Sequence, residues 1–263
     1  MAVMDVFLMA YTPDPGRVCG AAAKVCVSSR DPREIWDSTP REKLLGNLEA
    51  ALSRGHESVS EHAYFTFAVS GVSRALTHQL VRHRVASYSQ QSQRYVKLAR
   101  PRYVTPPTVK GDSEAERLYR EAVESAFKAY KRLMDLGVPL EDARYVLPNA
   151  AETSIVVSVN ARELLHILEL RLCLHAQWEI RMLASKMLQE ASKVAPEIMA
   201  RAGPPCKTKG RCPENDAKCP LYAQHIGGGA SPSAARDSPG QTGSLINPSL
   251  SGSGEGDTPG GGI

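Results

Sequence analysis

The sequence predicts an α+β fold in which a mixed or antiparallel sheet packs against long helices. Three observations predict it. The 263 residues are 42% hydrophobic and 23% charged, which suits a globular chain with a real core. Apolar residues recur at helical spacing over long stretches. The few strand-like runs are not interleaved one for one with the helices, which favours α+β over a doubly wound sheet.

The first part of the chain alternates strand and helix patterns. The run YFTFAVS alternates aromatic and small residues, as a half-buried strand does. One helix has its expected entry at Thr39–Pro40 and its expected end before Gly55. The polar segment 87–107 is expected to be irregular. The elements expected here are strands over 3–10 and 64–70 and helices over 17–28, 39–54 and 73–83.

The second part is mostly helical. An amphipathic pattern over 113–136 ends at Gly137, and β-branched residues over 153–159 predict a strand. Further helices are expected over 140–146, 161–174 and 177–194. In the last of these, Trp178 is expected in the core, and Glu179 and Arg181 are expected in solvent.

The composition divides the chain into three parts: a folded domain over 1–202, a Cys-containing extension over 203–224 and a flexible tail over 225–263. In the tail, 22 of 39 residues are Gly, Ser or Pro. The tail therefore has too few apolar side chains for their burial to offset the conformational entropy lost on ordering. Cys206, Cys212 and Cys219 lack the close pairing typical of zinc ligands, so no metal site is expected.

The net charge, the hydropathy and the number of cysteines argue against several classes of protein. A net charge of +4 is too small to indicate a nucleic-acid-binding protein. No apolar run of about 18 residues is present, so no membrane helix is expected. Six cysteines in a chain of this length are expected to be reduced, which indicates a cytoplasmic setting.

One stretch of the chain has no acidic residue. Residues 62–111 hold eight Lys and Arg and no Asp or Glu, so this segment carries +8. A solvated basic face paired with carboxylates from elsewhere is one interpretation. The same stretch is rich in His, Ser and Gln, however, and arginine forks bind phosphate oxygens in a bidentate manner. We therefore favour an anionic ligand such as a nucleotide, with RNA binding as an alternative.

Five separated blocks, spread over about residues 3–200, resemble flavin-dependent thymidylate synthases. The signature of that family is Arg-His-Arg followed, after seven residues, by Ser, which here is Arg82-His83-Arg84 and Ser92. The other blocks are His56-Glu57-Ser58 with Glu61-His62, His78-Gln79, Ala143 to Pro148, and Asn160-Ala161-Arg162 through Leu170-Arg171 to His175–Ile180. Their order along the chain makes the resemblance specific.

The resemblance implies an enzyme that makes dTMP from dUMP. Methylenetetrahydrofolate supplies the carbon, and FAD reduced by NADPH supplies the hydride. It also implies a homotetramer with active sites between subunits. A flavoprotein acting on another pyrimidine nucleotide and an RNA-binding protein without catalysis are the alternatives; the implied reaction needs neither nucleic acid nor a membrane.

The resemblance also implies roles for individual residues. Arg171 is the implied catalytic residue, favouring ionisation of the uracil N3. The implied FAD-binding residues are Ser58, Arg82, His83, Arg84, Gln90, Asn160, Ala161, Arg162 and His166. The implied dUMP-binding residues are Gln79, Leu80, Val81, Arg82, Gln90, Gln91, Ser92, Gln93, Arg94, Arg144 and Arg171. Many members have Asn-Glu where this chain has Ser89-Gln90, and a neutral Gln cannot act as a base.

The residues are consistent with the implied chemistry. Activating C5 of uracil needs either a cysteine nucleophile or removal of the N3 proton beside a stabilising cation. No cysteine of the folded part lies in a motif with a histidine base, whereas a guanidinium stays protonated and can serve as the cation. Arg162 and Arg171 lie nine residues apart on one predicted helix and so point in opposite directions. Such a pair could serve two ligands, or one of the two could form a surface ion pair with Glu163 or Glu169. The alternative for Arg162 alone is a surface arginine.

Overall fold

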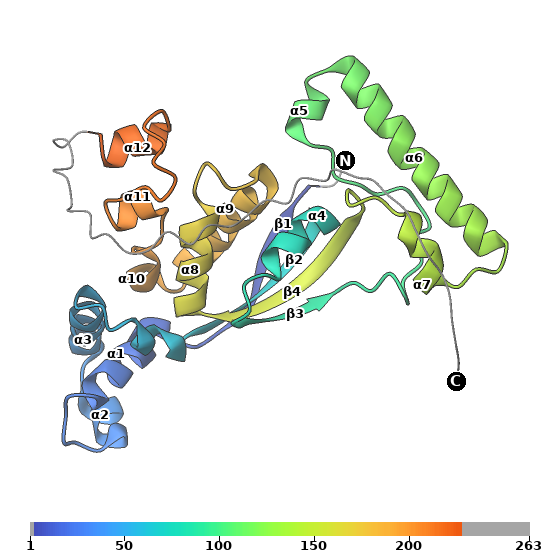
Figure 1. Ribbon diagram of the computed structural model, residues 1–263. Helices are drawn as coiled ribbons and strands as arrows, with labels where there is room; N and C mark the ends of the chain where they lie inside the picture. Colours follow the sequence, from blue (N-terminus) through green and yellow to red (C-terminus); the bar gives the residue numbers. More distant parts are fainter. Residues whose placement is uncertain (1–2, 228–263) are drawn as a thin grey trace, which may run out of the picture. The chain divides into compact units, whose positions relative to one another are not determined.

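A four-stranded antiparallel sheet is the centre of the fold in the computed structural model, which describes residues 3–227 (Figure 1). Its strands are β1 (Asp5–Tyr11), β2 (Tyr64–Ser73), β3 (Ala86–Gln90) and β4 (Glu152–Asn160), in the order β1-β2-β4-β3. The register pairs Phe7 with Ala68, Phe67 with Val157, and Tyr88 with Val157. The expected α+β class is confirmed, and the sheet is antiparallel.

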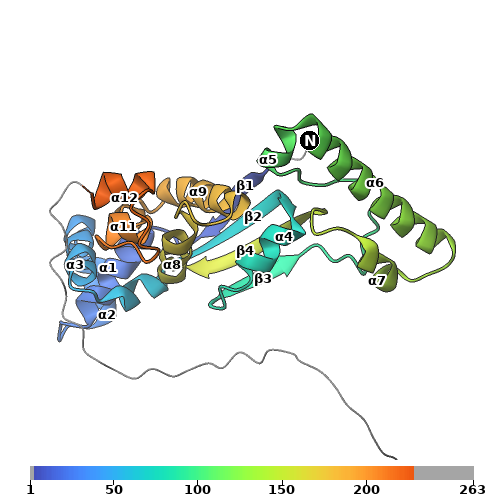
Figure 2. The ribbon, with the colours of Figure 1, turned by 45° about the horizontal axis from the view of Figure 1, so that its top comes forward.

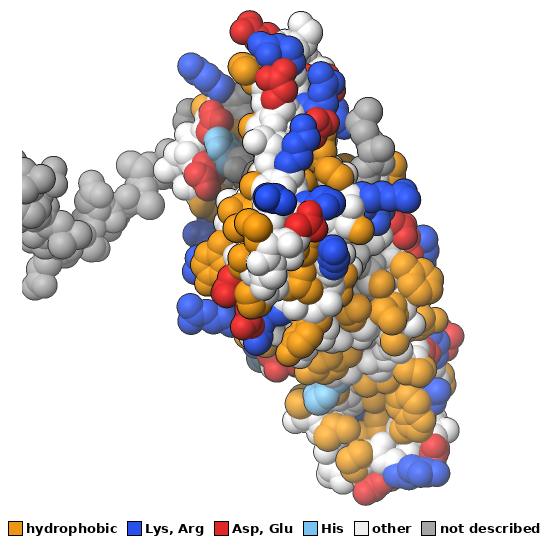
Figure 3. Space-filling model, turned by 90° about the vertical axis from the view of Figure 1, so that its right-hand side faces the viewer, with side chains coloured by type: hydrophobic (Ala, Val, Ile, Leu, Met, Phe, Trp, Pro, Cys, Tyr) orange, Lys and Arg blue, Asp and Glu red, His pale blue; other side chains and the backbone are white. Residues whose placement is uncertain are grey.

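Alternation along the strands gives the sheet one buried face. Phe65, Phe67 and Val69 of β2 point into the main core together with Val157 and neighbouring residues of β4. The opposite face stays more accessible: Phe7 of β1 and Tyr64 of β2 are 61% and 54% exposed. Figure 3 shows hydrophobic side chains gathered over the lower part of one face of the molecule.

Helices α8 (Ala161–Arg171) and α9 (Trp178–Ser192) cover the buried face of the sheet, with α4 (Arg74–Leu80) beside them (Figure 1). A second group contains α1 (Pro15–Val25), α2 (Pro32–Ser38) and α3 (Arg41–Ser53). Gly20 lets α1 approach α3, because a Cβ there would lie 2.1 Å from the carbonyl oxygen of Leu44. The turn η1 (Glu57–His62) connects this group to β2.

The long helix α6 (Ser113–Asp135) packs on a smaller core of its own (Figure 2). Val123 and Phe127 meet Ala151, which immediately precedes β4. Asp112 caps the helix by accepting hydrogen bonds from the first-turn amides. Short elements complete this region: α5 (Pro107–Lys110), α7 (Leu140–Ala143) and η2 (Arg144–Val146).

Two parts of the sequence prediction need correction. The segment from 87 onward is not all irregular, since β3 pairs with β4 along five residues. Its serines and glutamines carry no β-branched signal, and tertiary pairing decides the strand. Glu179 is not solvated: it is 2% exposed and accepts hydrogen bonds from the amide (2.7 Å) and hydroxyl of Ser73. Helix α2 was not expected at all.

The extension predicted for 203–224 forms α11 (Pro205–Thr208) and α12 (Pro220–His225), after α10 (Pro196–Met199). Two contacts connect it to the α8 region: Lys209 with Glu169, and His175 with Asp216 at 3.1 Å. The predicted boundary at residue 202 stays a prediction, and the predicted tail lies outside the described residues from 228 onward. Within 3–227, no helix is both long enough and apolar enough to cross a membrane.

Candidate active site

Two predicted site residues from distant parts of the chain meet at the end of α8. Arg171 is the last residue of this helix, and His83 lies between α4 and β3, 88 positions earlier in the chain. The Nε of Arg171 donates a hydrogen bond to Nε2 of His83, with 3.1 Å between the two nitrogens. The terminal nitrogens of the guanidinium take no part in this bond, so they can serve a ligand.

The His83 ring is neutral at neutral pH. It is 5% exposed, and its burial, together with the nearby charges of Arg171 and His166, lowers its pKa from 6.5 to about 4. Because Nε2 accepts from Arg171, the ring proton is on Nδ1, which lies 3.6 Å from a carboxylate oxygen of Glu163. A neutral imidazole can hold the guanidinium in place without repelling it. Burial also raises the pKa of Glu163 and lowers that of Arg171.

The start of α8 fixes the other predicted residues of this helix. Asn160 is 7% exposed and caps the helix by accepting a hydrogen bond from the amide of Glu163 at 2.8 Å. Arg162 points away from Arg171, as nine residues of helix require, and its Nη1 lies 2.6 Å from Glu61. A second carboxylate, Glu57, lies 3.7 Å from Nε of Arg162. Arg162 is thus a half-exposed, ion-paired arginine, as the alternative expected, but its partners are Glu61 and Glu57 and not Glu163 or Glu169.

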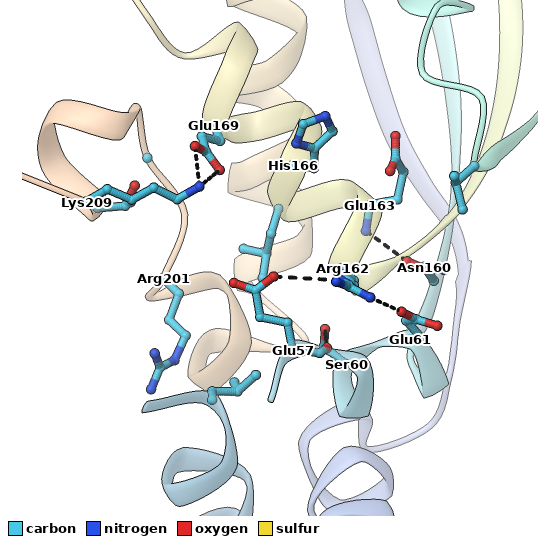
Figure 4. Close-up of a pocket in the computed structure, with 15 residues that line it drawn as sticks. Glu57, Ser60, Glu61, Asn160, Arg162, Glu163, His166, Glu169, Arg201 and Lys209 are labelled. Carbon is cyan, nitrogen blue, oxygen red and sulfur yellow. Dashed lines mark hydrogen bonds and ion pairs between the residues drawn. The ribbon is translucent and has the colours of Figure 1, made fainter. Parts of the chain in front are cut away.

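A cavity of about 600 Å³ opens beside this face of α8 (Figure 4). Three predicted cofactor-binding residues line it: Asn160, Arg162 and His166. Figure 4 shows Arg162 between Glu57 and Glu61, with His166 further along the same helix. The other residues of the lining were given no cofactor-binding role from the sequence, and they are Leu52, Glu57, Ser60, Glu61, Val85, Glu163, Leu165, Glu169, Arg201, Gly203, Thr208 and Lys209.

The lining fits the polar part of a flavin nucleotide. Three cationic side chains of the lining, Arg162, Arg201 and Lys209, can contact phosphate oxygens. Each of them already pairs with a carboxylate, and the lining also contains the carboxylates Glu57, Glu61, Glu163 and Glu169, so a bound phosphate would share these cations. Amide and hydroxyl groups of Asn160 and Thr208 add hydrogen-bonding capacity, and aliphatic side chains supply apolar surface. The cavity therefore has the donor set that a bound dinucleotide needs without a glycine-rich turn.

A second group of predicted residues lies beyond the other end of β3. Arg94 forms an ion pair with Glu141 of α7 at 2.7 Å, and Nε of Arg144 donates to the backbone carbonyl of the same residue at 3.0 Å. Arg74 belongs to this group, because burial and the charge of Arg144 lower its pKa. Arg74 is one of the eight basic residues of the acid-free stretch and has no role predicted from the sequence. Arg94 and Arg144 are two of the residues predicted to bind dUMP.

The remaining predicted residues are placed differently. Gln90 ends β3 and its amide donates to the hydroxyl of Thr77 at 2.9 Å. Ser58 is exposed on η1 and does not line the cavity, whereas Ser60 of the same turn does. The side chains of Leu80 and Ala161 are fully buried in the core, which leaves only their backbone atoms for a ligand.

Several other predicted residues are accessible and follow one another around β3. On the approach to the strand, Val81, Arg82 and Arg84 are exposed and Gln79 is half-buried. Past its end, Gln91 is exposed, and Ser92 and Gln93 are half-buried. The chain thus presents these polar groups along the edge strand of the sheet, between the Arg171 region and the Arg94 region.

The acid-free stretch is partly paired within the fold. Arg94 and Arg102 form ion pairs with Glu141 and Glu152, which both lie outside the stretch. The interpretation as a basic face paired from elsewhere thus holds for these two arginines. All six cysteines are free thiols. In the described residues no three His, Cys, Asp or Glu side chains gather as metal ligands would.

Comparison with known proteins identifies relatives over most of the chain. The family model described as "Thymidylate synthase complementing protein" matches residues 7–197. The flavin-dependent thymidylate synthase of Geobacter sulfurreducens is 47% identical over 223 residues, covering 84% of this chain and 96% of the relative. That of Clostridium tetani is 46% identical over 237 residues, covering 84% of this chain and 95% of the relative.

A solved structure supports the fold. The UMP/dUMP methylase PolB from Streptomyces cacaoi, bound with 5-Br dUMP, superposes with a TM-score of 0.66 at 26% identity. The match covers 76% of this chain and 94% of that one. Fold and site together define an α+β enzyme with a nucleotide-sized cavity beside an arginine- and histidine-bearing helix.

The family follows from the relatives. The chain belongs to the flavin-dependent thymidylate synthases, so the family and the enzyme class expected from the sequence are confirmed. The enzyme depends on a flavin, as the expected cofactor class requires. Family membership also favours the enzyme over the RNA-binding alternative.

Proposed function

We propose that the chain forms dTMP by reductive methylation of dUMP, with methylenetetrahydrofolate as carbon donor and FAD reduced by NADPH. The contact between Arg171 and His83 is the observation that carries the proposal. The relatives' shared name supports the reaction, and the 5-Br dUMP bound to the Streptomyces cacaoi methylase supports a uracil nucleotide as substrate. Free thiols at all six cysteines are consistent with the proposed cytoplasmic setting.

In this proposal Arg171 acts on the pyrimidine. Its guanidinium stays protonated at neutral pH and stabilises negative charge on the ring once the N3 proton leaves. His83 accepts a hydrogen bond from Nε of Arg171, and because its imidazole is neutral it does not repel the positive charge of the guanidinium. Burial strengthens this electrostatic effect because little water competes.

The phosphate of dUMP is proposed to bind near Arg94 and Arg144. Both arginines already converge on Glu141, so the phosphate would share them with one carboxylate and one backbone carbonyl. Gln91, Ser92 and Gln93 precede Arg94 and add donors beside the phosphate. Gln90 would lie between nucleotide and flavin, and as a neutral amide it positions rather than transfers a proton.

The flavin is proposed to occupy the cavity beside α8, held by Asn160, Arg162 and His166. When bound and reduced, it supplies the hydride that converts the methylene group to methyl, which no side chain can provide. Arg162 would neutralise phosphate charge there, and the predicted residues Arg82, His83 and Arg84 would bind the flavin with it.

We propose further that the enzyme is a homotetramer with active sites between subunits. The open face of the sheet supports this, since Phe7 and Tyr64 are 61% and 54% exposed on neighbouring strands. A hollow of about 290 Å³ on this side is lined by Phe7, Ser89 and Gln91, so a predicted nucleotide-binding residue borders the apolar surface. Covering that surface with another subunit would remove apolar area from water.

The test is dTMP formation by Arg171→Ala, with Arg120→Ala as the matched control. Arg120 is exposed on α6, away from the site. We expect at least a hundredfold loss of kcat for Arg171→Ala with FAD still bound, because a lost charge-stabilising donor costs about that much. Loss of FAD together with activity would show that Arg171 holds the cofactor instead.

UMP is a second candidate substrate, because the name of the Streptomyces cacaoi methylase includes UMP as well as dUMP. The same assay with UMP in place of dUMP distinguishes the two. Product from dUMP alone supports the thymidylate synthase. Faster turnover of UMP would support the alternative of a flavoprotein acting on another pyrimidine nucleotide.

A further inference from the structure

The cavity beside α8 has a wall that lies outside the blocks shared with the family signature. Thr208 and Lys209 of the extension line it, with Arg201 just before the extension. Figure 4 shows Lys209 and Arg201 across the cavity from Arg162 of α8. The family model ends at residue 197, so this wall lies beyond the region it matches. The extension is thus part of the same concave surface as the predicted flavin-binding residues.

The wall is fastened to the folded domain. Nζ of Lys209 lies 2.6 and 2.8 Å from the two carboxylate oxygens of Glu169, one turn of α8 beyond His166. His175 and Asp216 connect the extension to the loop after α8 at 3.1 Å. These contacts hold Lys209 at the edge of the cavity before any ligand binds.

The three cations of the cavity differ in how strongly the protein already engages them. Arg162 is engaged by two carboxylates, Glu61 and Glu57. Arg201 directs Nη2 to Glu49 and Ser53. Lys209 has one carboxylate partner, its side chain is 44% exposed, and an ammonium group has three donors.

We propose that Lys209 is a further binding residue for the anionic part of the flavin nucleotide, contributed by the extension. Glu169 orients the ammonium, and a phosphate oxygen of a dinucleotide is the ligand that the ammonium recognises. This inference rests on the proposed flavin site. It assigns the extension a role in selecting a phosphate-bearing flavin over an uncharged one.

The experiment compares Lys209→Ala with Lys218→Ala in the purified flavin-free protein. Lys218 is exposed in the same extension and does not line the cavity, so it removes the same charge elsewhere. Binding of FAD and of riboflavin, which carries no phosphate, is measured by flavin fluorescence at low and high salt. Thermal unfolding of each variant checks that the fold is kept.

We expect Lys209→Ala to weaken FAD binding about tenfold, the effect of losing one charge-assisted hydrogen bond. Riboflavin binding stays unchanged, the salt dependence of FAD binding becomes shallower, and Lys209→Arg restores most of the affinity. Lys218→Ala behaves like the wild type.

Two results overturn the inference while leaving the proposed site intact: unchanged FAD affinity in Lys209→Ala, or equal weakening for FAD and riboflavin. The second would mean that the side chain only shapes the wall. Failure of the proposed site looks different. In that case Arg162→Ala leaves FAD affinity unchanged, or the wild type does not bind FAD at all.

Discussion

We expect acid to destabilise this protein through one buried imidazole, that of His83. The ring is 5% exposed and its pKa in the folded state is about 4 against an ordinary 6.5. Between these two pH values His83 is protonated in the unfolded chain but stays neutral in the folded protein. His83 therefore contributes stability above pH 6.5, and this contribution is lost as the pH falls toward 4.

The magnitude follows from the difference in pKa. A difference of about 2.5 units corresponds to about 3 kcal/mol over the full range, at 1.36 kcal/mol for each unit. At pH 5 the unfolded state is almost fully protonated and the folded state is about 10% protonated, which gives a loss of about 2 kcal/mol relative to pH 8.

The assay is urea unfolding of the flavin-free protein at pH 8 and pH 5, for the wild type and His83→Gln. The loss of unfolding free energy between the two pH values should be about 2 kcal/mol smaller in the variant. His78→Gln, which removes an exposed histidine of α4, is the matched control and should keep the wild-type difference.

One neighbour acts in the opposite direction and needs its own variant. Burial raises the pKa of Glu163, so this carboxyl gains a proton more readily in the folded state and favours folding as the pH falls. Repeating the comparison of His83→Gln in a Glu163→Gln background removes this contribution. The reasoning is refuted if the variant and the wild type lose equal stability, or if an NMR titration places the pKa of His83 near 6.5.

Two further predictions concern stability and reactivity. Glu179→Gln should lower the unfolding free energy by about 2–4 kcal/mol, because the buried carboxylate accepts hydrogen bonds from both the amide and the hydroxyl of Ser73. Urea unfolding at pH 7 measures this loss, and a loss below about 0.5 kcal/mol would contradict the prediction. Cys19 should resist alkylation at pH 8 while the exposed Cys26 reacts within minutes, since burial raises the pKa of the Cys19 thiol to about 12. Peptide mass mapping measures both rates, and labelling of the two cysteines at similar rates would contradict this prediction.

Much of the fold could be predicted because it depends on local patterns. The strand over 153–159 and the long helix over 113–136 appear as β4 and α6 with boundaries within one residue at each end. Their β-branched run and their apolar spacing describe faces that any packing must bury. β3 could not be predicted in the same way, because Ala86–Gln90 has a polar sequence and is a strand only through its pairing with β4.

The candidate site, like the fold, has features that local sequence patterns predict and features that depend on tertiary structure. The order of the Arg-His-Arg block and the α8 residues was enough, by itself, to determine the family and the enzyme class, since those residue types at those spacings are specific. The meeting of Arg171 with His83, the neutral state of that histidine and the burial of Glu179 came only from the tertiary structure. Each depends on the distance and the desolvation between segments far apart in the chain, which no local pattern encodes.

The same holds for the extension. Its composition separated it from the folded domain, yet Lys209 reaches Glu169 and lines the cavity of α8. The sequence by itself determined which chemistry this chain performs and which helices and most strands it forms. The tertiary structure alone decided which side chains share one cavity, because a long side chain finds its partner through the path of the whole chain.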